Sequence, residues 1–252
     1  MATFRNPFPI DSSNPFGQWG WSTMPACPGY TPSDIWNWPA LAPSAARAAN
    51  KVDAKLRSIS TNGLWFIFTH EAAKNITNHL HWPGGASGVT LGPGYDMKAR
   101  TAAEITADMK AIGLSEATAK IVAQAATLSG DKADKFAHDH KKDVDLTDSQ
   151  QTNLLKHTVK SYEHTVRTSV KVALTQYEFD ALVSFAYNPG GHWHSVAHLI
   201  NTGNVKDAMK KIKASNTSKG KVMLGLTRRR EDEVKLFLEG KYEHNGKAIP
   251  AH

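Results

Sequence analysis

The sequence predicts an α+β fold that is mostly helical, with a short glycine-rich β hairpin and an N-terminal extension rich in proline and tryptophan. Three observations lead to this fold class. Helix-start signals recur along the body of the chain, and a run of glycines interrupts them at residues 79–96. Residues 1–43 hold eight of the 12 prolines and four of the seven tryptophans. We therefore divide the chain into an extension, residues 1–58, and a body, residues 59–252.

The extension contains two kinds of sequence. Proline at this density opposes regular helix, so residues 1–43 are predicted to form an extended arm whose aromatic side chains cover the body or a partner. From Ser44 the sequence SAARAANKVDAKLRSI is alanine-rich behind a serine N-cap, which predicts a helix that links the arm to the body. The first thirty residues lack a basic start and an unbroken apolar run, so we expect no general secretory signal.

The body carries signals for at least six further helices. Three of them start with a capping box, in which a threonine precedes Glu or Gln by three residues. The boxes are Thr101 to Glu104, Thr147 to Gln150 and Thr175 to Glu178. Further helices are predicted at residues 115–128, 204–212 and 226–238, the first closed by Gly130 and the last by Gly240. The charged stretch at residues 131–145 is predicted to be a solvated face.

Composition limits the possible functions. The chain has 252 residues, of which 40% are hydrophobic and 21% charged, so it can bury a core, and no window approaches the ~18 apolar residues of a membrane span. The net charge of +7 favours an anionic partner, which nucleic acid, acidic lipid and a carboxylate-bearing cell-wall polymer all satisfy. A nucleic-acid binder would need basic and aromatic residues interleaved on one surface, and only the run Arg228 to Arg230 is of this kind.

Neither cysteine nor histidine predicts a cofactor site. The single cysteine, Cys27, excludes an intramolecular disulfide and a zinc site of paired thiolates. The pairs His138 with His140 and His192 with His194 have a spacing that could chelate a metal, but neither has an obvious third ligand. We expect no cofactor and no metal.

Glu71 is the first candidate for chemistry. It continues the apolar stripe of Leu64, Ile67 and Phe68 along a predicted helix. A buried carboxylate must either pair with a cation or keep its proton, and its place near the C-terminal end of the helix disfavours the negative charge. Both outcomes suit a general acid. The alternative at this point is a purely structural glutamate paired with an arginine.

The glycine-rich hairpin supplies a second polar group. In SGVTLGPGYD, Thr90 and Asp96 are separated by two glycines that allow a tight turn and a close approach to a ligand. A helix glutamate that faces a hairpin aspartate is the carboxylate pair that glycoside hydrolysis requires. Tyr95 and Trp82 flank the predicted site, where they could stack on sugar rings or simply pack.

Four segments in order give the chain from Ser60 to Tyr242 a resemblance to the phage-type lysozymes. They are the helix GLWFIFTHE that bears Glu71, the element Thr90-Leu91-Gly92-Pro93-Gly94, the helix LTQYEFDALVSFAYNPG and the terminal helix GLTRRREDEVKLF. The resemblance implies a peptidoglycan muramidase that cuts between N-acetylmuramic acid and N-acetylglucosamine, with residues 59–252 as its catalytic domain.

The same resemblance assigns roles to the candidate residues. Glu71 is implied to be the general acid, and Thr90 to position water or substrate. Commoner members carry the aspartate where this chain has Trp82 to Ser87 and no carboxylate, whereas pesticin-like members carry it six residues after the threonine. Asp96 is therefore the expected second carboxylate, in a pesticin-like branch. Arg229, turned inward from the terminal helix, is implied to hold Glu71.

The expected route to the substrate follows from the lack of a secretory signal. A protein made in the cytoplasm would reach the periplasm of a host or target bacterium through phage lysis or a type VI secretion system. The extension favours the second route, with a secretion-machine component and an immunity protein as partners. Two alternatives stay open: a lytic transglycosylase, which needs only the glutamate, and a catalytically inactive module that binds the cell wall.

Overall fold

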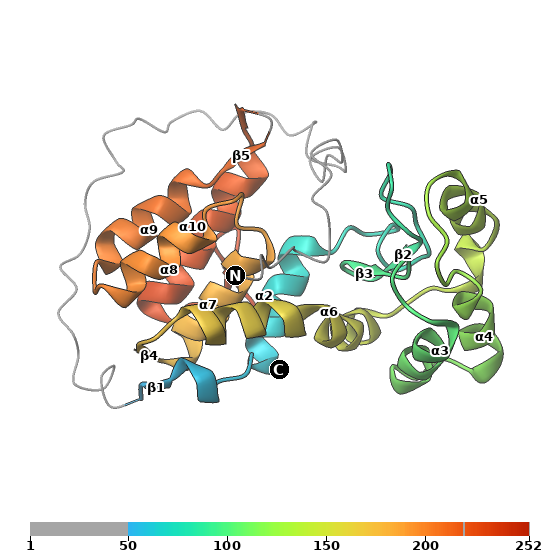
Figure 1. The fold of residues 1–252 in the computed structure, drawn as a ribbon, viewed down its shortest axis with the longest axis horizontal. Coiled ribbons are helices and arrows are strands. Elements are labelled where there is room, and N and C mark those ends of the chain that lie inside the picture. Colours follow the sequence, from blue (N-terminus) through green and yellow to red (C-terminus); the bar gives the residue numbers. More distant parts are fainter. Residues whose placement is uncertain (1–49, 219, 252) are drawn as a thin grey trace, which may run out of the picture.

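The structure is a computed structural model, and it describes residues 50–218 and 220–251. The arm predicted at residues 1–43 and the start of the predicted linking helix lie outside the described residues. The described part is mostly helical and forms two lobes, the large lobe on the left of Figure 1 and the small lobe on the right. The long helix α6 (Asp148–Ser169) contributes to both.

The large lobe is built from helices and short strand pairs. Its helices besides α6 are α2 (Thr61–Glu71), α7 (Gln176–Tyr187), α8 (Trp193–Asn201), α9 (Val205–Ala214) and α10 (Leu224–Glu239), with the 3-10 turn η2 (Ala54–Leu56). Its antiparallel strand pairs are β1 (Val52–Asp53) with β4 (Ala173–Leu174), β5 (Thr217–Ser218) with β6 (Lys221–Val222), and β7 (Glu243–His244) with β8 (Lys247–Ala248).

The small lobe contains the glycine-rich hairpin and short helices. Its elements are β2 (Thr90–Leu91), β3 (Tyr95–Asp96), α3 (Ala102–Ala111), α4 (Glu116–Ala123), α5 (Asp131–Asp139) and the 3-10 turn η3 (Lys141–Asp143). In the hairpin, Thr90 lies opposite Asp96 and Leu91 opposite Tyr95. His81 extends the hairpin by a backbone bridge to Thr90 on the other side. The predicted hairpin at residues 79–96 is therefore confirmed.

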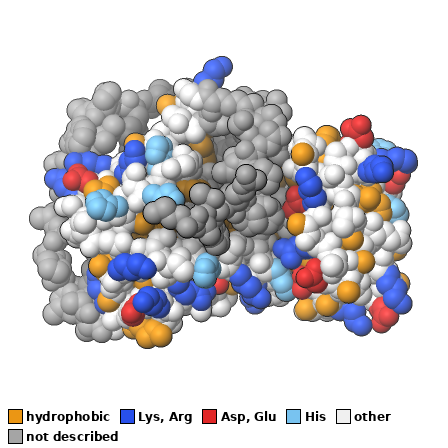
Figure 2. Space-filling view, in the orientation of Figure 1, with side chains coloured by type: hydrophobic (Ala, Val, Ile, Leu, Met, Phe, Trp, Pro, Cys, Tyr) orange, Lys and Arg blue, Asp and Glu red, His pale blue; other side chains and the backbone are white. Residues whose placement is uncertain are grey.

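Charged side chains of both signs are visible on the described part of the face shown in Figure 2. On the face shown in Figure 2, Lys and Arg side chains occur on both lobes and are interspersed with Asp and Glu. No helix in the described residues is both long enough and apolar enough to cross a membrane.

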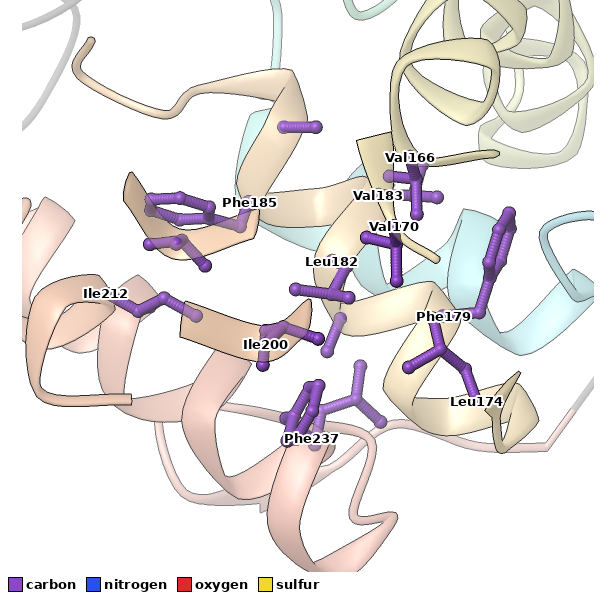
Figure 3. Close-up of a cluster of buried hydrophobic side chains, with 14 of the residues drawn as sticks. Val166, Val170, Leu174, Phe179, Leu182, Val183, Phe185, Ile200, Ile212 and Phe237 are labelled. Carbon is purple, nitrogen blue, oxygen red and sulfur yellow. The ribbon is translucent and has the colours of Figure 1, made fainter. Parts of the chain in front are cut away.

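Each lobe has its own hydrophobic core. In the large lobe, α7 lies at the centre, and every residue from Glu178 to Ala186 is buried. Figure 3 shows Phe179 and Leu182 of α7 among side chains from α6, α8, α9 and α10, which confirms the predicted scaffold role of α7. On α6, Leu154 belongs to the core of the small lobe, whereas Leu155 belongs to that of the large lobe. Neighbouring residues of one helix thus tie the two cores together.

All three predicted capping boxes are present. At Thr101, Thr147 and Thr175, the hydroxyl accepts the N–H of the residue three positions later, and that residue's side chain accepts the threonine's own N–H. These caps satisfy donors that a helix end would leave without partners. Gly240 closes α10 in the left-handed conformation, as its sequence predicts.

The predicted linking helix is wrong over residues 50–59. Val52 and Asp53 instead pair with β4, and Arg57 donates from Nε to the carbonyl of Leu174 at 3.0 Å and from Nη1 to the Gln176 side chain at 3.0 Å. These contacts span more than a hundred residues of sequence and outweigh the helix propensity of the alanines, which contributes only a small free energy. The end of the predicted extension thus packs on the large lobe.

Two other boundaries differ from the prediction. The helix predicted at residues 115–128 ends at Ala123, and Thr127 takes a positive φ of 62° that helix cannot contain. Gly130 precedes α5 instead of closing α4, and the charged stretch forms this helix with Ala133 and Ala137 buried. Its charged side chains lie mostly outward, as predicted.

Helix α8 was missed, although its sequence carried a usable signal. Trp193, Val196, Ala197 and Ile200 are buried at helical spacing, whereas the preceding Pro-Gly-Gly and the histidines favoured a loop.

Candidate active site

Glu71 is the last residue of α2, at the side of the large lobe where the chain leaves for the small lobe. The predicted apolar stripe of α2, Leu64, Ile67 and Phe68, is buried. Gly63 and Phe66 are buried as well. The Glu71 side chain retains 15% exposure, so it lies at the boundary of the core and can still meet solvent or a ligand.

Arg229 of α10 holds the Glu71 carboxylate, as predicted. Its Nη1 donates to Glu71 Oε1, its Nε to Glu233 Oε1 at 3.1 Å and its Nη2 to the carbonyl of Ser184 at 3.2 Å. Burial alone would lower the pKa of Arg229, but the charges of Glu71 and Glu233 outweigh it and raise the pKa. The guanidinium is therefore a fixed cation with one orientation relative to Glu71.

A second buried ion pair supports Arg229. Glu233, fully buried one turn along α10, also accepts from Arg230 Nη1 and from the Ser184 hydroxyl at 2.7 Å. Arg230 further donates to the carbonyl of Asn188 and, from Nε, to that of Ser215 at 3.0 Å. The sequence predicted one inward arginine, but both turn inward because one glutamate carboxylate accepts from the two of them.

His70, the residue before Glu71, belongs to a cluster of histidine and aspartate side chains. His70 Nε2 is 3.7 Å from Asp232 Oδ2, and its ring centroid is 4.7 Å from that of His244. Burial, followed by the charge of Arg229, lowers the pKa of His70, and burial raises the pKa of Asp232 to about 6. Sequence reasoning missed this cluster because β7, which carries His244, gives no local signal for its contact with α2.

The start of α2 is fixed by another residue that the sequence did not single out. Asp180 of α7 is fully buried and accepts from the N–H and hydroxyl of Ser60, from Gln176 Nε2 at 2.9 Å and from the Tyr242 hydroxyl at 2.7 Å. Gly63 is needed beside it, because a Cβ there would lie 2.6 Å from Asp180 Cγ. Both ends of the helix that bears Glu71 are thus held by side chains.

The structure brings Thr90 and Asp96 together across the hairpin. Both contact Gly88: its N–H donates to Asp96 Oδ2 at 3.2 Å, and its carbonyl accepts from the Thr90 hydroxyl at 3.4 Å. Asp96 Oδ1 accepts from the N–H of Lys98 at 2.7 Å. Thr90 is buried, whereas Asp96 is half-buried. Within the described residues, neither forms a hydrogen bond with Glu71.

Tyr95 is a packing residue in this structure. It is fully buried in the small-lobe core, its hydroxyl donates to Asp108 Oδ2 at 2.7 Å, and the Arg100 guanidinium lies 4.0 Å from its ring centre. A ring enclosed in this way cannot stack on a sugar, so the expected supporting role becomes that of fixing the hairpin on α3. Trp82 is half-buried, and its Nε1 donates to the Ser87 carbonyl at 3.2 Å.

Two contacts connect the hairpin turn to the surroundings of Glu71. The N–H of Gly92 donates to the carbonyl of Thr77, six residues after Glu71, at 2.8 Å. The hydroxyl of Tyr187, the last residue of α7, donates to the carbonyl of Pro93 at 3.0 Å. These contacts place the turn of the hairpin next to the helices that surround Glu71.

The predicted absence of a metal site stays an expectation. Among residues 50–218 and 220–251, no three His, Cys, Asp or Glu side chains gather in a way that could hold a metal. His194 lies in the first turn of α8 and not in the loop expected for it.

Comparisons with known proteins identify relatives of part of the chain. A family described as a domain of unknown function, DUF8812, matches residues 66–182. The chain is 42% identical over 98 residues to an endolysin of Bacillus phage B103 and 40% identical over 98 residues to an endolysin of Bacillus phage PZA. The matches cover 38% of this chain and 37% and 38% of the two endolysins, so they span little more than a third of each relative.

One solved structure shows a similar fold. An endolysin from Escherichia coli O157:H7 phage FAHEc1 matches with a TM-score of 0.50 and 22% identity, over 75% of this chain and 98% of the endolysin. The muramidase domain of SpmX from Asticaccaulis excentricus gives a TM-score of 0.48 at 23% identity, over 72% and 98% of the two chains.

The fold is therefore that of a phage endolysin. Over part of its length the chain is also related in sequence to Bacillus phage endolysins, which confirms the resemblance carried by the four motifs. The pesticin-like branch stays a prediction.

Proposed function

We propose that the protein is a peptidoglycan muramidase in which Glu71 is the general acid. One observation carries the proposal: a partly exposed glutamate ends a buried helix and is held by the buried Arg229, in a chain with the fold of a phage endolysin. A fixed carboxyl group at this place can deliver a proton along one direction.

The reaction needs a proton donor and a water molecule. Glu71 gives its proton to the glycosidic oxygen as the bond between that oxygen and the anomeric carbon breaks. Water then adds to the anomeric carbon, and its proton passes to a base. Asp96 is the proposed second carboxylate, and the Thr90 hydroxyl beside it is proposed to orient the water or the sugar. The +7 charge of the chain favours a polymer that carries peptide carboxylates.

The test compares the full-length wild type with Glu71→Gln and with a matched control, Glu116→Gln. Glu116 is exposed on α4 and pairs with two surface lysines, Lys110 and Lys120. We expect Glu71→Gln to lower the rate of clearance of purified sacculi at least about 100-fold, because the general acid is lost. The control should clear at the wild-type rate. Equal clearance by wild type and Glu71→Gln would remove Glu71 from the mechanism, and no clearance by the wild type would favour an inactive binding module.

A lytic transglycosylase is the second candidate, and one observation favours it. Both carboxylate oxygens of Asp96 already accept backbone N–H groups, so its capacity to serve as a base is partly used. A transglycosylase closes an anhydro ring without water and leaves no role for Asp96. Mass spectra of the products distinguish the two, because a muramidase leaves reducing ends and a transglycosylase leaves anhydro ends. Asp96→Asn should slow only a muramidase.

Delivery by a type VI secretion system or by phage lysis forms a separate part of the proposal. It rests on the composition of residues 1–43 and on the relation to phage endolysins. Protection of a sensitive strain by the product of a neighbouring gene would support an injected toxin with a cognate immunity protein.

A further inference from the structure

Tyr187 occupies the junction between the two lobes. It ends α7, at the centre of the large lobe, and its hydroxyl donates across to the carbonyl of Pro93 in the hairpin turn of the small lobe. The turn fits closely against this hydroxyl. Gly94 takes a positive φ of 79°, and a Cβ built on it would lie 2.5 Å from Tyr187 Oη. Neither the motifs nor the proposed mechanism assigns a role to this contact.

Tyr187 also belongs to the surroundings of Glu71. Its ring packs on that of Tyr162 of α6, with 4.6 Å between centroids. Burial raises the pKa of both hydroxyl groups, and the charge of Glu71 raises it further. The next residue, Asn188, accepts from Arg230, which shares Glu233 with Arg229. One end of α7 therefore contacts both the arginine pair and the hairpin.

We propose that Tyr187 is a positioning residue that sets the distance between Glu71 and the hairpin pair Thr90 and Asp96. The inference rests on the proposed function, in which these side chains act on one sugar linkage. Its physical basis is the hydrogen bond from the Tyr187 hydroxyl to the hairpin turn, which joins the turn to the end of a buried helix of the large lobe. A displacement of about 1 Å between catalytic groups is enough to slow a reaction strongly.

The variant that tests the proposal is Tyr187→Phe, which keeps the ring against Tyr162 and removes only the hydroxyl. We expect kcat on soluble, uncrosslinked peptidoglycan strands to fall about 10-fold with little change in KM, because binding surfaces are kept and alignment is lost. The melting temperature should fall by only a few degrees, since one hydrogen bond contributes about 1 kcal/mol.

Ser169→Ala is the matched control. It removes a hydroxyl that accepts from Trp193 Nε1 at 3.1 Å and so joins the end of α6 to α8. We expect this variant to lose stability at least as much as Tyr187→Phe and to keep its kcat. A similar fall of kcat in both variants would mean that general loss of stability explains the effect, and would overturn the proposal.

Hydrogen exchange of the peptide that covers residues 88–96 gives a readout that does not depend on activity. In Tyr187→Phe this peptide should exchange faster than in the wild type, because the hairpin turn has lost its contact with α7. Unchanged exchange, or faster exchange with an unchanged kcat, would overturn the positioning role. A wild-type protein with no activity would sink the proposed function, and the exchange experiment would still show whether Tyr187 holds the hairpin.

Discussion

At the scale of single residues, the arrangement around Glu71 depends on how many acceptors one guanidinium can serve. Arg229 uses three nitrogens for three different acceptors: Glu71, Glu233 and the Ser184 carbonyl. A lysine carries the same charge on one nitrogen and cannot reproduce this fork. Arg229 is therefore required for its shape as well as its charge.

The substitution Arg229→Lys should separate these two contributions. We expect a loss of about 2 kcal/mol or more in the free energy of unfolding, because hydrogen bonds to buried charged groups are lost. Clearance of sacculi should fall as well, since Glu71 is no longer held in one orientation. Arg228→Lys on the same helix, at a half-exposed site, should change stability by less than about 0.5 kcal/mol. Chemical denaturation measures both, and equal effects would argue against a special role for Arg229.

Asp232 predicts a pH dependence of stability. Its pKa is raised to about 6 in the folded protein, chiefly by burial, whereas an unfolded chain has a value of about 4. The folded state thus binds the proton more tightly, and Asp232 lowers the stability of the wild type as pH rises from about 4 to about 6. The pKa values of His70 and His244 are lowered, because the fold favours their neutral forms. As the pH falls, these two histidines therefore lower the stability of the fold, whereas Asp232 raises it.

The variant Asp232→Asn removes the titrating group and keeps an acceptor for the N–H of Asn245. We expect it to be more stable than the wild type at pH 8, by an amount on the order of 2 kcal/mol, and to lose this advantage below about pH 4. Denaturation midpoints measured over this range test the sign. A difference that stays constant with pH would show that the ionisation of Asp232 is not the cause.

The residues that could be predicted from sequence are those marked by helical spacing of apolar residues or by a motif. Glu71 and Arg229 were both predicted on the buried faces of helices, and the structure contains the contact between them. Asp180 and Tyr187 could not be singled out, because their partners Ser60 and Pro93 lie 120 and 94 residues away in the sequence. Tyr95 looked like a sugar contact only because sequence does not show which side of a hairpin faces the core.

At the scale of elements, helix ends were predictable wherever the signal was local. The three capping boxes and the closing Gly240 involve residues within four positions of each other. The segment at residues 50–59 was mispredicted because its structure depends on β4 and Gln176, far along the chain. Propensity is a weak term that such distant pairing outweighs.

The hairpin turn allows a matched comparison of two glycines. Gly94 and Gly113 both have positive φ, 79° and 88°, but a Cβ meets Tyr187 Oη at 2.5 Å in the first and nothing within 4 Å in the second. Both alanine variants should lose about 1 kcal/mol to backbone strain. Gly94→Ala should lose about 1 kcal/mol more, and this excess should shrink in the Tyr187→Phe background. Equal losses by thermal or chemical denaturation would mean that the turn yields to the extra methyl group without cost.

At the scale of the whole molecule, the net positive charge should strengthen the attraction of the protein to the anionic cell wall. The Debye length shortens from roughly 10 Å at 0.1 M salt to about 3 Å at 1 M, so attraction to a polymer of carboxylates is screened. We expect binding of Glu71→Gln to sacculi to weaken several-fold as salt rises through this range. Sacculi whose carboxylates have been amidated serve as the control. Salt dependence that persists on amidated sacculi would show that another force dominates binding.

The division into two lobes was not evident from sequence, although most of the helices were. Each lobe has its own core, and a helix pattern does not show that Leu154 and Leu155 of α6 enter different cores. The assignment of neighbouring positions to two cores is a property of the folded arrangement alone.

This assignment restricts how the length of the chain can change during evolution. A residue inserted into α6 after Leu154 would rotate everything that follows by about 100° and advance it by about 1.5 Å. The leucine that now faces one core would then face water or the wrong neighbour. Homologous chains of different length should accordingly keep α6 uninterrupted and place their insertions and deletions in the loops that precede Thr147 or follow Ser169.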